Sequence, residues 1–156
     1  MEKTLIILKP DAVQRGLTGR IIARFEEKGF QIVAMKLMKI DGSLAERHYG
    51  VHQGKPFYAR LLQYITSSPV VVMVVQAVNG VAVARKMMGA TFGSKAEPGT
   101  IRGDFGLSNS FNLIHGSDSA ESAGFEIGLY FKPEELAGYD RAGEKWIYDF
   151  SGDAPE

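Results

Sequence analysis

The segment Asn112–Ser119, with sequence NLIHGSDS, sets a histidine between apolar residues and a run of Gly, Ser and Asp, residue types that favour turns and helix caps. We predict that Gly116 lets the backbone turn tightly and exposes the His115 imidazole. Ser117 and Asp118 are predicted to cap the helix that follows. A neutral imidazole fixed in this way has one ring nitrogen free to attack phosphorus, provided that the other nitrogen donates its proton to a fixed acceptor.

Glu126 is a candidate for that acceptor, although its carboxylate could also be simply exposed to solvent. His115 could likewise be a packed structural residue, because its ring tolerates partial burial. His48 and His52 lack a comparable frame of turn residues, and we predict that both lie at the surface. A protein-held zinc site is not expected, because the three histidines are spread along the chain, cysteine is absent and no His-Glu-x-x-His pattern occurs.

Cationic and hydroxyl side chains elsewhere in the chain could hold phosphate: Lys9, Arg85, Thr91 and Arg102. The Walker A pattern and the Gly-x-Gly-x-x-Gly fingerprint are both absent, so a bound nucleotide must be held by side chains. Guanidinium groups match phosphate oxygens in two-point geometry, and lysine supplies a point charge where a strand ends. Taken singly, each cation is equally compatible with a solvated surface charge. Only their convergence would make a site.

Two aromatic residues allow two interpretations each. Phe57 could face the core of a helix together with Leu61, or it could expose a ring on which a nucleobase stacks. Tyr49 could be a packing residue, or it could place its hydroxyl near a phosphate. Spacing alone leaves both choices open.

The elements that must position these residues alternate between strand-like and helical patterns. Strands are predicted at 4–8, 30–40, 69–78 and 127–131, and helices at 18–28, 43–49, 56–65, 81–88 and 119–126. A long loop is predicted for residues 90–110, where glycine, proline and polar residues dominate. This order matches a split βαβ repeat with a mostly antiparallel sheet covered by helices, and a doubly wound parallel sheet is the competing topology.

Composition favours one ordinary globular domain. Eighteen basic and eighteen acidic residues cancel, which removes the electrostatic attraction expected of a protein whose main partner is nucleic acid or an anionic membrane. The most apolar stretch, residues 69–78, is too short to cross a bilayer, and no long apolar signal segment is seen at the start. The absence of cysteine excludes disulfides and thiol chemistry, and it is compatible with a cytoplasmic location.

Four segments together resemble the nucleoside diphosphate kinase family: KPDAVQRGL at 9–17, GAT at 89–91, PGTIRGDF at 98–105 and NLIHGSDS at 112–119. The similarity runs from Thr4 to about Tyr148, which gives a kinase domain at 1–148 and a C-terminal extension at 149–156. The resemblance implies an α+β fold of the ferredoxin-like α/β sandwich type, with a mostly antiparallel four-stranded sheet covered by helices.

The resemblance also implies an activity: reversible transfer of the γ-phosphate of a nucleoside triphosphate such as ATP to nucleoside diphosphates, through a phosphohistidine on His115. It implies Mg²⁺ on the nucleotide phosphates, a homo-oligomer (tetramer or hexamer), and no metal bound by the protein alone. The implied phosphate-binding residues are Lys9, Arg85, Thr91 and Arg102. Asn112 and Lys9 would meet the ribose, Phe57 would stack on the base, Tyr49 would line the site, and Ser117 and Glu126 would orient His115.

Two positions depart from the family pattern. Phe92-Gly93 stands where the family usually has Asn-Pro, and Phe111 stands where a charged residue is usual. Two other functions fit parts of the sequence. A regulatory nucleotide-binding module on the same fold would not need His115, and a metal-assisted phosphohydrolase would need a ligand cluster that the spacing does not show.

Overall fold

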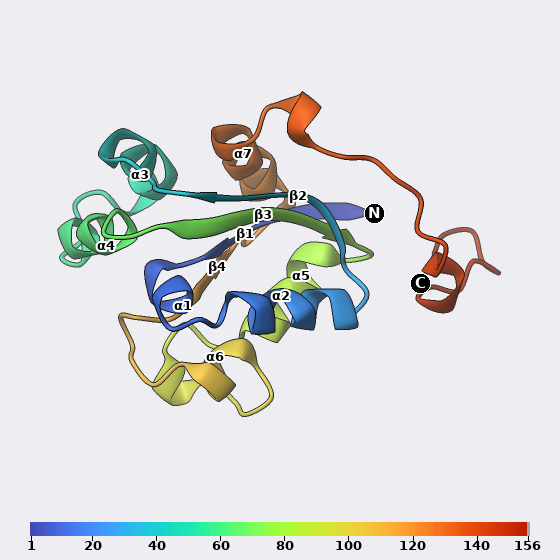
Figure 1. Ribbon diagram of the computed structural model, residues 1–156, viewed down its shortest axis with the longest axis horizontal. Coiled ribbons are helices and arrows are strands. Elements are labelled where there is room, and N and C mark those ends of the chain that lie inside the picture. Colours follow the sequence, from blue (N-terminus) through green and yellow to red (C-terminus); the bar gives the residue numbers. More distant parts are fainter. Residues whose placement is uncertain (156) are drawn as a thin grey trace.

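The computed structural model describes residues 1–155 and is built on a four-stranded sheet in the order β2-β3-β1-β4 (Figure 1). The strands are β1 (Glu2–Leu8), β2 (Gln31–Met38), β3 (Val70–Ala77) and β4 (Ile114–Gly116). Each neighbouring pair is antiparallel. The predicted α+β class with an antiparallel sheet is therefore confirmed, and the competing parallel topology is wrong.

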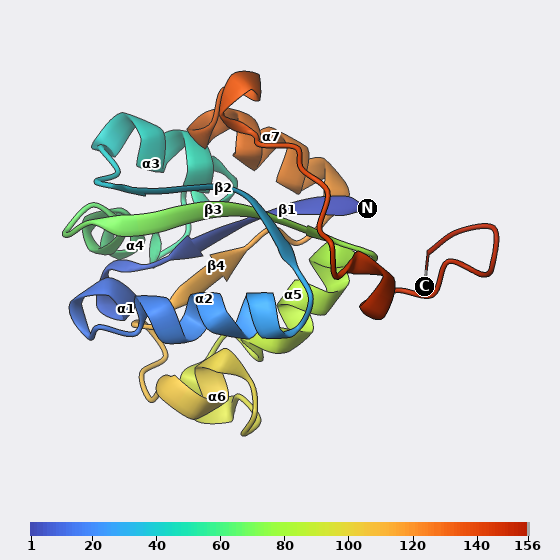
Figure 2. The ribbon, with the colours of Figure 1, turned by 45° about the vertical axis from the view of Figure 1, so that its right-hand side comes forward.

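Helices cover both faces of the sheet, with α2 and α5 on one side and α3 and α7 on the other (Figures 1 and 2). The α-helices are α1 (Pro10–Gln14), α2 (Thr18–Glu27), α3 (Gly42–Tyr49), α4 (Tyr58–Ile65), α5 (Gly80–Met88), α6 (Ile101–Phe105) and α7 (Ala120–Tyr130). Short 3-10 helices are η1 (Gly50–His52), η2 (Gly93–Lys95), η3 (Pro133–Glu135) and η4 (Glu144–Trp146). This arrangement is the predicted ferredoxin-like sandwich.

Two hydrophobic clusters explain why the central strands are apolar on both faces. Successive side chains of a strand point to opposite sides of the sheet. In β1, Ile6 and Leu8 pack with Phe25 of α2, while Leu5 and Ile7 pack in the cluster that contains Tyr130 of α7. Strands covered on both faces read as continuous apolar runs, as the TLIIL segment does.

The fourth strand lies elsewhere than predicted. Residues 127–131 are not a strand, because the helix that begins at Ala120 continues to Tyr130. A capping box fixes its start, since the Ser119 hydroxyl accepts from the Ser122 backbone N–H. The helix is apolar because it lies on the sheet. The fourth strand is instead β4, which contains His115 itself.

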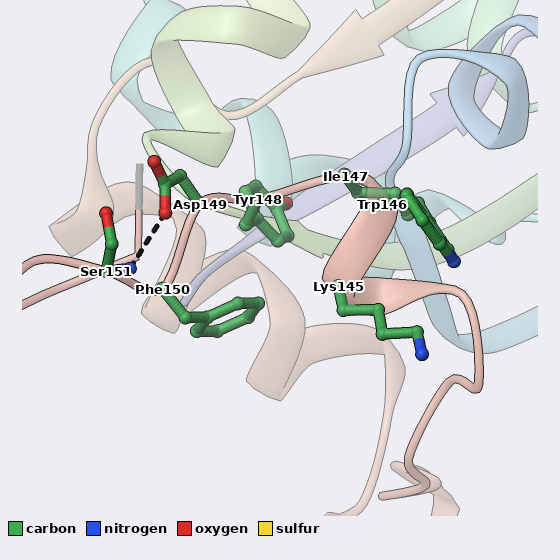
Figure 3. Close-up of a pocket in the computed structure, with 7 residues that line it drawn as sticks. All are labelled: Lys145, Trp146, Ile147, Tyr148, Asp149, Phe150 and Ser151. Atoms are coloured by element: carbon green, nitrogen blue, oxygen red, sulfur yellow. Dashed lines mark hydrogen bonds between the residues drawn. The ribbon is translucent and has the colours of Figure 1, made fainter.

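The end of the chain runs back across the molecule after α7 (Figure 1). The Ala137 N–H donates to the Val33 carbonyl at 2.7 Å, which covers part of the outer edge of β2. Further along, the Val78 N–H donates to the Tyr148 hydroxyl at 3.3 Å. Figure 3 shows the hollow formed by Lys145–Ser151. None of the residues predicted for the functional site is among the residues that line it. Within residues 1–155, no helix combines the length and the hydrophobicity needed to span a membrane.

Candidate active site

The pairing of β1 with β4 brings together site residues from the start and from the last third of the chain. In the antiparallel pairing of β1 with β4, Ile7 lies opposite His115. Just beyond the pair, the Lys9 N–H donates to the Leu113 carbonyl at 2.8 Å. The Lys9 ammonium donates to Asn112 Oδ1 at 2.7 Å. Residues more than a hundred positions apart in sequence are therefore held in direct contact.

The sharp backbone bend that precedes His115 is at Leu113 and not at Gly116. Leu113 has a φ of 70°, a left-handed conformation that is uncommon for a residue other than glycine. Its N–H donates to Asp11 Oδ2 at 3.1 Å, and Asp11 also accepts a hydrogen bond from the Tyr64 hydroxyl. Gly116 lies in β4, where a Cβ would approach Met88 Sδ to 2.6 Å. Gly116 is thus needed for close packing, and the predicted turn at this position is wrong.

His115 is anchored through one ring nitrogen. Its Nε2 lies 3.0 and 3.1 Å from the two carboxylate oxygens of Glu126, so that nitrogen donates its proton to the carboxylate. The Ser117 hydroxyl donates to Glu126 Oε2 at 2.5 Å and accepts from the Leu5 N–H at 3.2 Å. Within residues 1–155, Nδ1 makes no hydrogen bond and keeps its lone pair. Glu126 is mostly buried, so the interpretation of it as a solvent-exposed carboxylate is wrong.

The charge of Glu126 is set by two opposing effects. Burial alone would raise the pKa of Glu126, but the hydrogen bonds and charge of His115, together with the Ser117 hydroxyl, outweigh burial and hold the pKa below its usual value. The carboxylate is therefore ionised at neutral pH. An ionised acceptor fixes the proton on Nε2 and stabilises positive charge on the ring.

His48 is part of this site, contrary to the prediction that it lies at the surface. It is 5% exposed, and its ring meets the His115 ring edge-on with centroids 4.6 Å apart. Burial, followed by the neighbouring His115, lowers the pKa of His48 to about 3, so this ring is neutral. His48 shares the buried face of α3 with Ala45 and Tyr49, and this helical spacing was the signal in the sequence.

Arg85 and Arg102 donate hydrogen bonds to the backbone around His115. Arg102 is 5% exposed and donates to three carbonyls: those of Asn112 at 3.0 Å, Gly89 at 3.0 Å and Ile114 at 2.6 Å. Arg85 donates to the Gly116 carbonyl at 3.1 Å. The carbonyls on both sides of His115 are therefore held by guanidinium groups.

Lys9, Arg85 and Arg102 lie close enough for their positive charges to repel one another. Burial and the charge of Arg102 lower the pKa of Lys9 to about 8, although Asp11 acts in the opposite direction. Burial and the charge of Arg85 lower the pKa of Arg102 to about 10. A polyanion placed among these groups would relieve the repulsion.

The remaining predicted residues surround the same region. Asn112 donates from Nδ2 to the Thr91 carbonyl at 2.9 Å. Tyr49 is buried, and its hydroxyl has no partner within residues 1–155. Phe57 is 49% exposed, so its interpretation as a core residue is wrong. Ring contacts lead from Phe57 through His52 and Tyr49 to His115, with centroid distances of 5.4, 6.5 and 6.2 Å.

The two departures from the family pattern leave these contacts in place. Phe111 packs edge-on against Tyr64 with centroids 5.1 Å apart, and so buttresses the residue that holds Asp11. Phe92 is exposed and lies at the start of η2. Gly93 must be glycine, because a Cβ there would come within 2.6 Å of the Gly106 carbonyl oxygen.

Comparisons with known proteins identify the family of the chain. Residues 2–136 match the family described as nucleoside diphosphate kinase. A nucleoside diphosphate kinase of Desulfitobacterium hafniense is 61% identical over 147 residues, which cover 94% of this chain and 99% of the relative. The chain belongs to the nucleoside diphosphate kinase family. A nucleoside diphosphate kinase from Thermomicrobium roseum is 56% identical over 147 residues, which cover 94% of this chain and 99% of the relative.

Solved structures of nucleoside diphosphate kinases share the fold. That of a halophilic nucleoside diphosphate kinase from Halobacterium salinarum in complex with CDP has a TM-score of 0.93 and 45% identity, covering 95% of this chain and 99% of the other. A family protein from Babesia bovis has a TM-score of 0.91 and 41% identity, covering 95% and 100%. The chain is an enzyme with nucleoside diphosphate kinase activity, as the sequence resemblance implied.

Replacement of Ser117 by alanine tests the anchoring of Glu126. We expect the transfer rate to fall about tenfold, because the carboxylate loses a fixed hydrogen bond and holds the His115 ring less firmly. The matched control is Ser119→Ala, which removes a helix cap that is exposed and costs about 1 kcal/mol of folding free energy. Steady-state transfer and thermal unfolding of both variants separate the effects. Equal loss of transfer in the two would contradict the anchoring role.

Proposed function

We propose that the enzyme transfers the phosphoryl group in two half-reactions, with His115 as the carrier. One observation above all supports this route: the bond of Nε2 to Glu126 at 3.0 Å, which leaves Nδ1 unprotonated in a neutral ring. Donor and acceptor nucleotides can then use one site in turn. A nucleotide-binding module without turnover would have no need of this arrangement.

The chemistry balances within the site. In the first half-reaction the Nδ1 lone pair forms a bond to the γ-phosphorus, and the bond from that phosphorus to the bridging oxygen breaks, releasing a nucleoside diphosphate. The ring gains positive charge, which Glu126 stabilises through the Nε2 proton. In the second half-reaction a terminal phosphate oxygen of another nucleoside diphosphate attacks the same phosphorus, and the N–P bond breaks. The imidazole returns to its starting state.

We propose that the polyphosphate is held by the cations and hydroxyls around His115: Lys9, Arg85, Thr91, Arg102 and Tyr49. Positioning and fixed positive charge are the main sources of catalysis in phosphoryl transfer. The unpartnered Tyr49 hydroxyl and the mutually repelling cations support this role. In the structure Arg102 already donates hydrogen bonds to three backbone carbonyls. To bind a phosphate, its guanidinium group would have to share or exchange one of these bonds.

The nucleoside is proposed to lie toward Phe57, with Asn112 and Lys9 at the ribose. The half-exposed ring of Phe57 offers a stacking surface that every nucleobase can use, which predicts low base selectivity. The Halobacterium salinarum relative was solved in complex with CDP, and we propose that nucleoside diphosphates occupy the equivalent place here.

We propose Mg²⁺ as the cofactor, held mainly by the nucleotide phosphates. The described residues fit this mode, because Mg²⁺ typically takes one or two carboxylates together with substrate phosphates. Asp118 is exposed, and the charges of both Arg85 and His115 influence it. The Asp118 carboxylate would help to hold Mg²⁺, which when bound would supply neutralisation of the phosphate charge.

The low pKa of Lys9 gives nucleotide binding a pH dependence. In the protein without nucleotide, the pKa of Lys9 is about 8. A bound polyphosphate would raise this pKa, because its negative charge stabilises the ammonium group. We therefore expect affinity for ADP to fall as pH rises through about 8, with proton uptake on binding above that pH. Calorimetry in buffers of different ionisation enthalpy measures the uptake. Lys9→Gln should abolish it, and binding without proton uptake in the parent would contradict the assignment.

Assembly, domain limits and location are further parts of the proposal. Met35 and Leu37 are exposed on the edge strand β2, and a second copy of the chain would cover them, which supports self-association. We propose a tetramer or a hexamer, as the family resemblance implies. Light scattering with size-exclusion chromatography measures the subunit number. We propose a domain at 1–148 and an extension at 149–156, since within residues 1–155 Tyr148 is the last residue that hydrogen-bonds to the body of the fold. We also propose a cytoplasmic location, where nucleotides are found.

A labelling experiment tests the proposed route. The protein is incubated with γ-labelled ATP and Mg²⁺, freed of nucleotide, and then given GDP. We expect protein-bound label that is stable to base, labile to acid and transferred to GDP. A module without turnover would carry no label, and a phosphohydrolase would release free phosphate.

A further inference from the structure

His48 presents an unexplained feature next to the nucleophile. Its side chain is 1% exposed, and within residues 1–155 neither ring nitrogen has a hydrogen-bond partner. Buried polar atoms normally find a partner, because leaving one unpaired costs free energy. His48 Nε2 lies 3.8 Å from Glu126 Oε1, too far for a hydrogen bond. Both groups therefore have acceptor atoms close enough to bind one shared ion.

His115 completes a set of three donors. One atom each from His48, His115 and Glu126 lies within 4.8 Å of the others. Two imidazoles and one carboxylate, with an open fourth position, form a donor set that protein zinc sites use. Ligand atoms about 2.0–2.1 Å from a tetrahedral ion lie about 3.3 Å apart. The distances from Glu126 Oε1, 3.0 Å to His115 and 3.8 Å to His48, lie on either side of this value.

We propose that His48, His115 and Glu126 bind Zn²⁺, and that the bound ion blocks phosphoryl transfer. The expectation of no zinc site rested on the spread of the histidines along the sequence, whereas α3 places His48 beside His115 in the structure. Ser117 holds Glu126 Oε2 and leaves Oε1 for the metal, as outer hydrogen bonds do in metal sites. Imidazole donors favour Zn²⁺ over Mg²⁺, so this site differs from the proposed Mg²⁺ position on the phosphates.

The inhibition follows from the tautomer of His115. When Zn²⁺ takes the lone pair of Nε2, the proton that this nitrogen carried must move to Nδ1. The ring stays neutral, but the nitrogen proposed to attack phosphorus no longer has a lone pair. Inhibition therefore rests on the proposed role of His115, whereas binding of the metal does not. In the part of the chain that the structure describes, His48 Nδ1 has no hydrogen-bond partner to orient the ring, so we expect micromolar rather than tighter affinity.

Crystals of the parent protein, soaked in ZnCl₂ without nucleotide, test the binding directly. We expect an anomalous peak at the zinc absorption edge, about 2.0–2.2 Å from the three donor atoms. Zinc found only at other places, or no peak at all, would overturn the site. This measurement needs no variant and does not depend on activity.

Zinc titration in solution, followed by calorimetry, assigns the donors. We expect His48→Gln to weaken binding at least about tenfold. His52→Gln is the matched control, because His52 is a neighbouring histidine that lies outside the cluster, and it should bind as the parent does. Circular dichroism checks that both variants fold. Equal affinity in the parent and a folded His48→Gln would overturn the assignment.

Inhibition is measured by adding Zn²⁺ before an excess of labelled ATP and Mg²⁺. We expect loss of protein-bound label and its full return when EDTA is followed by fresh Mg²⁺. Labelling at the parent rate with zinc bound would overturn the inhibitory step. Failure to label without zinc would instead contradict the proposed function and leave the metal site to the crystallographic test.

Discussion

Replacement of His115 by alanine should lower phosphoryl transfer at least about 10⁴-fold, because no side chain then remains to accept the phosphoryl group. Nucleotide binding should persist, since the cations Lys9, Arg85 and Arg102 come from other segments of the chain. Transfer from ATP to GDP is measured in the steady state, and affinity for ADP by calorimetry. Loss of both together would show that the substitution damages the fold.

The matched control for this change is His52→Ala. His52 is partly exposed and contacts Tyr49 and Phe57, but it does not touch His115 or Glu126 in the ring contacts and hydrogen bonds described. We expect its transfer rate to stay within about threefold of the parent. Transfer at the parent rate by His115→Ala would contradict the role of carrier.

Replacement of Arg102 by methionine should have the second largest effect, on stability as well as on activity. Three carbonyls lose their donor, and the free energy of unfolding should fall by about 3 kcal/mol, since each unsatisfied buried acceptor costs about 1–3 kcal/mol before relaxation. Transfer should also fall by about 10²-fold, because the strand that carries His115 loosens. Urea unfolding and steady-state kinetics measure the two effects.

Arg47→Met provides the comparison for Arg102. Arg47 is exposed on α3, and its loss should change the free energy of unfolding by less than about 0.5 kcal/mol. If Arg102→Met unfolds at the same urea concentration as Arg47→Met, the guanidinium is not a structural clamp on β4. Its role would then be confined to the phosphates.

Much of the fold was predictable because burial leaves a clear pattern. The apolar runs at 4–8 and 69–78 predicted the two central strands β1 and β3, which are covered on both faces. The run at 127–131 misled, because a short apolar segment does not distinguish a buried strand from a buried helix. The true fourth strand has only three residues, Ile114–Gly116, too few for any period to appear.

The candidate site was also predictable only in part. Residue types predicted a phosphate-binding, nucleophilic chemistry, but the convergence of Lys9 with Asn112 depends on the pairing of β1 with β4. Gly116 was interpreted as a turn because glycine often serves there, whereas its space is taken by Met88. The general exposure of histidine predicted a surface position for His48, whereas His48 lies on the buried face of α3 together with Ala45 and Tyr49.

The structural role of Asp11 could not be predicted from the sequence either. It stands in the KPD segment beside Lys9, where a carboxylate is easily taken for a solvated charge. In the structure it fixes the left-handed Leu113 and accepts from Tyr64. Such a role depends on a strained residue distant in sequence, which no local pattern encodes.

The position of the phosphoryl group on the imidazole tests the central claim most directly. Protein labelled with ¹⁵N in histidine is phosphorylated by ATP and Mg²⁺, and ³¹P–¹⁵N couplings identify the bonded nitrogen. Because Glu126 holds the proton on Nε2, we predict phosphorus on Nδ1 of His115. Phosphorus on Nε2, or on any other residue, would contradict the account.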